Sequence, residues 1–264
     1  MDWKRAPIDT TMHIAFLLVT IFMGPLGVLV YVLTAREPLP GTHTAYIALQ
    51  WKQAVGSTLH CVAGDSIGIV GAAVITGVIR LPMVISLLVE YAAGFLVGWL
   101  IFQALFMKDM VGGSYLKAVR TMFMPEWLSM NGVMAGMAII MVVAVHENAR
   151  FSSPVYLPFW FMMAMALILG SVLAYPINWW LVAHKLKHGI MSTAGSTRSH
   201  THHSALRHAD AVMSAVQENA PIKRQHTQHR TRVNSTSNHP YNTLIVLASM
   251  ALFLASLALA VWID

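Results

Sequence analysis

Six long apolar segments restrict this chain to folds that live in a membrane. Each segment is close to the roughly 20 residues that a helix needs to cross the hydrocarbon of a bilayer. Only 11% of the 264 residues are charged, against about a quarter in an average soluble domain. We therefore predict an all-α polytopic bundle with about six spans. Their predicted bounds are 11–34, 55–79, 81–107, 126–145, 155–177 and 241–264.

The segment 192–240 differs in composition from the spans around it. Ser, Thr, Asn, Gln and His dominate it, and seven of the thirteen histidines fall there. It has too few large apolar residues to form a core, so we expect a flexible His-rich loop between a membrane bundle at 1–191 and the last span. Two interpretations of its histidines stay open, weak metal binding and a solvated linker.

The net charge of +6 is carried by loops rather than by spans. Lys and Arg in loops orient membrane helices and meet anionic lipid, so we expect the lipid bilayer as a partner and no nucleic acid. With six spans, thirteen of the seventeen basic residues share a side with the His-rich loop. The positive-inside rule then predicts a bacterial inner-membrane protein whose His-rich loop is cytoplasmic and whose two termini lie outside.

The second segment carries groups that are rare inside a membrane helix, namely His60, Cys61 and Asp65. An ionised carboxylate at the bilayer centre costs about 2.5–3.5 kcal/mol on insertion scales, so such residues usually have a function. Cys61 and Asp65 are four residues apart and share a helix face. Imidazole, thiolate and carboxylate are ligands for zinc or copper. The alternative interpretation is that these groups form hydrogen bonds between helices.

Two further segments contribute candidate ligands. Glu90 and Asp65 differ by about five residues in predicted depth in the membrane, so both could line one polar path across it. The alternative is that Glu90 is protonated and hydrogen-bonded to a neighbouring helix. Met130 and Met134 lie on one stripe with Glu126, and thioethers select Cu(I), although methionine is also an ordinary packing residue. The predicted metal site therefore comprises His60, Cys61, Asp65, Glu90, Met130 and Met134.

A basic stretch follows the fifth predicted span. Lys185 and Lys187 alternate with His184 and His188 along it. Two lysines would repel a metal cation, so we expect this stretch to face lipid headgroups rather than to bind metal. Gln103, near the end of the third segment, is expected to cap or pack.

Several motifs of this chain resemble those of a bacterial integral membrane family catalogued as domain of unknown function forty-three ninety-six. The resemblance covers about residues 50–191 and rests on short runs of sequence. These runs are Trp51-Lys52, His60-Cys61-x-x-Gly64-Asp65-x-x-Gly68, Tyr91-x-x-Gly94-Phe95, Tyr175-Pro176-x-Asn178-Trp179-Trp180-Leu181 and Lys187-His188-Gly189-x-Met191. The resemblance implies a helical membrane domain, and the family's association with copper proteins implies copper handling.

These observations give one leading hypothesis and two alternatives. The leading hypothesis is a membrane transporter or metallochaperone for a soft transition metal, copper first and zinc second, with a copper protein or another membrane protein as partner. The main alternative is a non-catalytic membrane subunit or assembly factor, and a membrane-embedded metalloenzyme comes third. The sequence contains no G-x-S-x-G motif, phosphate loop or paired-cysteine motif, which favours a role other than that of an enzyme.

Overall fold

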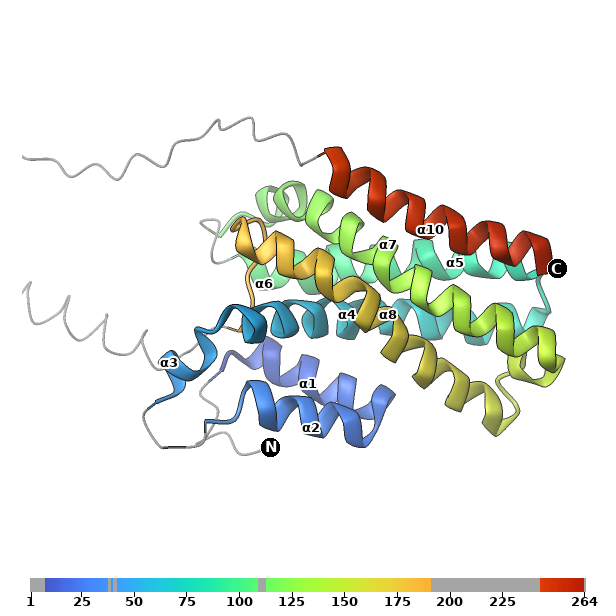
Figure 1. Ribbon diagram of the computed structural model, residues 1–264, viewed down its shortest axis with the longest axis horizontal. Helices are drawn as coiled ribbons and strands as arrows, with labels where there is room; N and C mark the ends of the chain where they lie inside the picture. The colour runs from blue at the N-terminus through green and yellow to red at the C-terminus, as the bar shows by residue number, and fades with distance from the viewer. Residues whose placement is uncertain (1–7, 38, 40–41, 109–112, 191–242, 264) are drawn as a thin grey trace, which may run out of the picture.

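The computed structural model describes residues 8–37, 39, 42–108, 113–190 and 243–263, and the regular elements of this part are helices (Figure 1). Five of them are long and apolar enough to cross a membrane, which confirms the predicted all-α membrane fold. They are α4 (Gln50–Ile79), α5 (Met83–Leu96) continued by the π-helix η1 (Val97–Gln103), α7 (Tyr115–Glu147), α8 (Leu157–Ala183) and α10 (Thr243–Ile263).

The first apolar segment differs from the single span predicted at 11–34. It forms two helices, α1 (Thr10–Met23) and α2 (Pro25–Thr34), which lie side by side (Figure 1). Gly24 breaks the segment with a φ of 62°, and Pro25 begins α2 because its missing N–H is not needed at a helix start. At 14 and 10 residues each helix is about 21 or 15 Å long, which is short of the hydrocarbon thickness.

Helices α7 and α4 form the centre of the bundle. In their most apolar stretches 78% and 61% of the residues are buried, against 17% in α10. Helix α8 crosses α7 and α4, whereas α10 lies along α7 and α5 at the periphery (Figure 1). The outer faces expose many large apolar side chains, among them Ile75, Phe161 and Leu247, which the lipid of a bilayer would cover.

Close approach of backbones holds the central helices together. A Cβ added at Gly136 of α7 would lie 2.5 Å from the backbone nitrogen of Gly170 in α8. Polar side chains attach the last helix, because Tyr91 donates to Asn131 at 2.9 Å and Asn131 donates to Ser249 of α10 at 3.4 Å. Small residues and interhelical hydrogen bonds are the usual means of helix association in membranes.

Short helices connect the spans: α3 (His43–Ile47), α6 (Ala104–Lys108) and the 3-10 helix η2 (Ala149–Ser152). Helix α7 begins eleven residues before the predicted span at 126–145, and it continues through Pro125. The predicted His-rich loop at 192–240 lies outside the described residues.

Candidate functional site

Five polar side chains meet inside the bundle, and we call this group the lysine cluster. They come from α4, η1, α7 and the turn after α8, so four segments far apart in the sequence converge on one point. Each of the five is buried. The members of the lysine cluster are Cys61, Asp65, Gln103, Glu126 and Lys187.

An ion pair forms the centre of the lysine cluster. Lys187 Nζ lies 2.9 Å from Glu126 Oε2, and the two side chains are 2% and 0% exposed. Cys61 joins both partners, because its Sγ–H donates to Glu126 Oε2 at 2.9 Å and its sulfur also contacts Lys187 Nζ. Gln103 Nε2 donates to the same sulfur at 3.1 Å. The thiol is therefore surrounded by one ammonium, one carboxylate and one amide.

Asp65 brings a second carboxyl group to the lysine cluster. It lies one helical turn from Cys61 and interacts electrostatically with Glu126 and Lys187. Gly98 of η1 leaves the space for both acids, because a Cβ there would collide with Asp65 Oδ1 and come within 3.0 Å of Glu126 Oε1. Two carboxyl groups thus lie near one ammonium in the buried interior of the bundle, and Glu126 is the one that pairs with it.

Lys187 reaches the lysine cluster because the chain turns back after α8. Lys185 adopts a φ of 59°, and Leu186 N donates to Leu181 O at 2.9 Å, which closes the turn. Ile190 then packs against Gly56 of α4, and Gln53 Nε2 donates to its carbonyl oxygen at 2.9 Å. Backbone hydrogen bonds to α8 thus hold the start of this return segment, residues 184–190, and contacts with α4 hold its far end.

Burial alone would lower the pKa of the Lys187 ammonium. The Cys61 sulfur and the Glu126 carboxylate beside it outweigh that effect and raise the pKa of Lys187 above its ordinary value. The lysine therefore carries its charge at physiological pH, although it lies inside the bundle.

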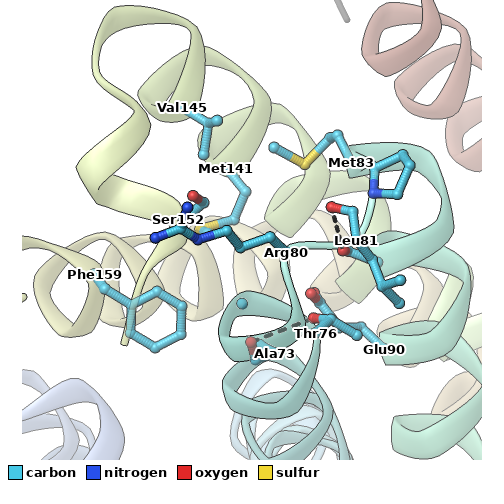
Figure 2. Close-up of a pocket in the computed structure, with 13 residues that line it drawn as sticks. Ala73, Thr76, Arg80, Leu81, Met83, Glu90, Met141, Val145, Ser152 and Phe159 are labelled. Carbon is cyan, nitrogen blue, oxygen red and sulfur yellow. Dashed lines mark hydrogen bonds between the residues drawn. The ribbon is translucent and has the colours of Figure 1, made fainter. Parts of the chain in front are cut away.

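The structure brings together only part of the predicted metal site. Cys61 and Asp65 belong to the lysine cluster, and His60 lies beside it with its ring 6.0 Å from that of Phe102. Glu90 lines a separate pocket near Thr76 (Figure 2). Met130 and Met134 are fully buried in the hydrophobic core, where the methyl group of Met130 contacts Gly94. Among the described residues, no three His, Cys, Asp or Glu side chains are grouped to hold a metal.

Sequence reasoning missed three members of the lysine cluster. In the sequence Glu126 begins the methionine stripe, and its signal is that of a carboxylate beside an apolar run. Lys187 was expected to face headgroups, and its burial depends on the turn after α8, for which we find no local sequence signal. Gln103 was expected to cap or pack, and it donates to Cys61.

The lysine cluster falls within a region that a known protein family shares. The sequence profile of the domain of unknown function DUF4396 matches residues 50–187 of the 264, which is more than half of the chain. The chain belongs to the DUF4396 family. The resemblance seen in the sequence motifs is thereby confirmed. Neither the comparison with curated proteins nor that with solved structures gives a match.

The DUF4396 region corresponds to a distinct part of the fold. It begins with the first residue of α4 and ends at Lys187, so it contains the whole lysine cluster. The α1–α2 pair and α10 lie outside it. The part of the bundle that defines DUF4396 is therefore the part that assembles the buried charges.

The burial of Cys61 makes a prediction about its reactivity. Its side chain is 0% exposed, so a maleimide should react with the native protein at least about tenfold more slowly than with the SDS-unfolded chain. The variant His184→Cys in a Cys61→Ser background is the matched control, because residue 184 is exposed at the end of α8. Equal labelling rates for Cys61 and for this control, read by mass spectrometry, would contradict the enclosed cluster.

Proposed function

We propose that the protein is a membrane transporter that carries a soft transition-metal cation, copper first and zinc second, in exchange for protons. Cys61, Asp65 and Glu126 form the exchange site, and Lys187 occupies it between transport cycles. The observation that carries the proposal is the ammonium of Lys187, which lies 2.9 Å from Glu126 and in contact with Cys61. The position proposed for the metal ion is therefore already occupied by a cation, the ammonium group of a lysine side chain.

Charge balance supports proton exchange. Two carboxyl groups and a thiol surround one ammonium, and an excess negative charge costs several kcal/mol in a medium of low dielectric constant. We therefore expect at least one of the acids to hold a proton while Lys187 is in place. When the Cys61 sulfur binds Cu(I), the S–Cu bond replaces the S–H bond and the thiol proton is released.

The position of Lys187 supports its role as a removable occupant. It belongs to the return segment rather than to a spanning helix, so it can leave the site without the unfolding of a span. Cys61, Asp65 and Glu126 are not grouped to hold a metal while Lys187 is in place, so the proposal requires them to close around the ion, as one soft and two hard ligands, once Lys187 has left. His60 lies next to them, and its imidazole is the type of group that zinc and copper accept as a ligand.

The α1–α2 pair changes the side expected for the N-terminus. If the pair enters and leaves the membrane on one side, the residues before α4 share a side with those after α8. Fifteen of the seventeen Lys and Arg residues then lie on that side, against two, Arg80 and Arg150, on the other. The positive-inside rule places that side, with the His-rich loop, in the cytoplasm of a bacterial inner-membrane protein. The residues before α1 join it, in place of the external N-terminus expected from six spans.

Proteoliposomes that contain trapped pyranine provide the test. When Cu(I) is supplied outside as its glutathione complex, we expect internal copper to rise and the internal pH to rise with it. Cys61→Ser should reduce copper uptake at least tenfold, because it removes the soft ligand. Met165→Leu is the control, since Met165 is a thioether on the lipid-facing side of α8. Zn²⁺ in place of Cu(I) tests the second cargo.

A folded wild-type protein that neither binds nor moves Cu(I) or Zn²⁺ would rule out the transporter. Recovery of one stable membrane partner from the same preparation would then support the subunit interpretation. Copper uptake without any change of internal pH would contradict proton exchange while leaving the metal cargo standing.

A further inference from the structure

A second polar site lies at the other end of α4. The pocket opens beside the turn between α4 and α5, and it is closed by the end of α7, by η2 and by the start of α8 (Figure 2). Its volume is about 180 Å³, below the roughly 300–1,000 Å³ of pockets for drug-sized ligands, so an occupant would be the size of a lipid headgroup or an amino acid. It contains no member of the lysine cluster, and the proposed transport does not use it.

The pocket is lined by one acidic and one basic side chain. Glu90 is 5% exposed on α5 and hydrogen-bonds with Thr76, whereas Arg80 ends α4 in the left-handed region with a φ of 55°. Figure 2 shows Arg80 extending toward Ser152, away from Glu90. The structure describes both charged side chains and places no ion pair between them. An acid and a base thus line one cavity without forming an ion pair with each other.

We infer that this pocket binds a small zwitterion that joins a primary ammonium to an anionic group. Glu90 accepts hydrogen bonds from the ammonium, and Arg80 donates to the anion, which is a phosphate or a carboxylate. Met83, Met141 and Phe159 line the cavity beside these groups and contact the carbon atoms of the ligand. A bound zwitterion supplies both the buried Glu90 and the exposed Arg80 with a counter-charge, whereas a simple cation or anion serves only one of them.

The location of the pocket leaves two sources for this chemistry. The ends of α4 and α7 and the starts of α5 and α8 lie at the level where a spanning helix meets lipid headgroups. The headgroup of phosphatidylethanolamine carries an ammonium and a phosphate, and a free amino acid carries an ammonium and a carboxylate. Both have the charges that Glu90 and Arg80 require.

Binding to the delipidated full-length protein separates the two sources. Native mass spectrometry should show retained phosphatidylethanolamine and no retained phosphatidylglycerol if the source is lipid. Titration calorimetry with glycine and L-leucine should show binding if the source is a free amino acid. In either case Arg80→Gln and Glu90→Gln should each weaken binding about tenfold or more, because each removes a charge-assisted hydrogen bond. Arg150→Gln is the control, since Arg150 is exposed near the same end and does not line the pocket.

Competition on the wild-type protein needs no variant. Phosphoethanolamine should displace the bound probe, and glycerol phosphate, which lacks the ammonium, should not. If no zwitterion binds, or if Arg80→Gln and Glu90→Gln bind as tightly as the wild type, the inference is wrong. The result does not depend on copper transport, because no member of the lysine cluster takes part.

Discussion

Replacing Lys187 with Met should lower the free energy of unfolding by about 3–5 kcal/mol, because it leaves the carboxylate of Glu126 buried without its cation. Glu126 is fully buried, so water cannot take the place of the ammonium. A reversible SDS titration in mixed micelles measures the change. Lys185→Met is the matched control, since Lys185 lies two residues away and is exposed, and it should change stability by less than about 0.5 kcal/mol.

The double variant Lys187→Met with Glu126→Gln shows how much of the stability loss comes from the broken ion pair and how much comes from any substitution at a buried position. Glutamine is neutral and nearly the same size as glutamate, so the second change should restore most of the lost stability. The coupling energy between the two positions should then exceed about 2 kcal/mol. Additive effects of the two changes would show that the pair does not act as a unit, which would also weaken the proposed exchange site.

Gly68→Ala should destabilise the bundle by about 1–3 kcal/mol, although alanine is the better helix former. The added Cβ would collide with Ala93 of α5 and lie 2.8 Å from the Cα of Gly94, and the backbone offers no rotamer by which to escape. The two helices would have to separate, and the shift would reach the lysine cluster through Asp65, one turn away.

Gly71→Ala provides the matched control for this packing effect. Gly71 lies three residues further along α4, and a Cβ there would have no atom within 4 Å. This change should be neutral or should stabilise the protein by up to about 1 kcal/mol, as glycine-to-alanine changes in open helix positions do. Melting temperatures of both variants in one detergent measure the difference. Equal effects at Gly68 and Gly71 would mean that α4 and α5 are not in backbone contact.

The spans could be predicted because their physical cause is local. A run of apolar residues near 20 long is sufficient for a membrane helix, and five of the six predicted spans correspond to candidate membrane helices, of which α7 begins eleven residues early. The segment at 11–34 has the same length and apolarity, yet Gly24 and Pro25 divide it. Hydropathy cannot distinguish a kinked span from a folded pair, because the distinction depends on packing against α4 and α8.

The site was predicted in part for the same reason. Cys61 and Asp65 were noticeable as polar groups in an apolar helix, and that signal lies within one segment. The partners of these groups come from other segments, and no periodicity within α4 can identify them. Lys187 is the clearest case, because its neighbours His184, Lys185 and His188 are all exposed while it is buried. Its role depends on the return of the chain after α8.

The π-helix η1 changes the direction in which side chains point along the span formed by α5 and η1. A π-turn takes up about one residue more than an α-turn, so the residues beyond it are rotated by about 100° from where a continuous α-helix would put them. Glu90 precedes η1 and Gln103 is its last residue. The same span therefore places Glu90 in the pocket and Gln103 against Cys61, although the two residues lie on opposite sides of the change in helical direction. Deletion of a single residue from η1 would rotate Gln103 away from Cys61 and break its hydrogen bond to the thiol. Glu90 precedes η1, so its position in the pocket would not change.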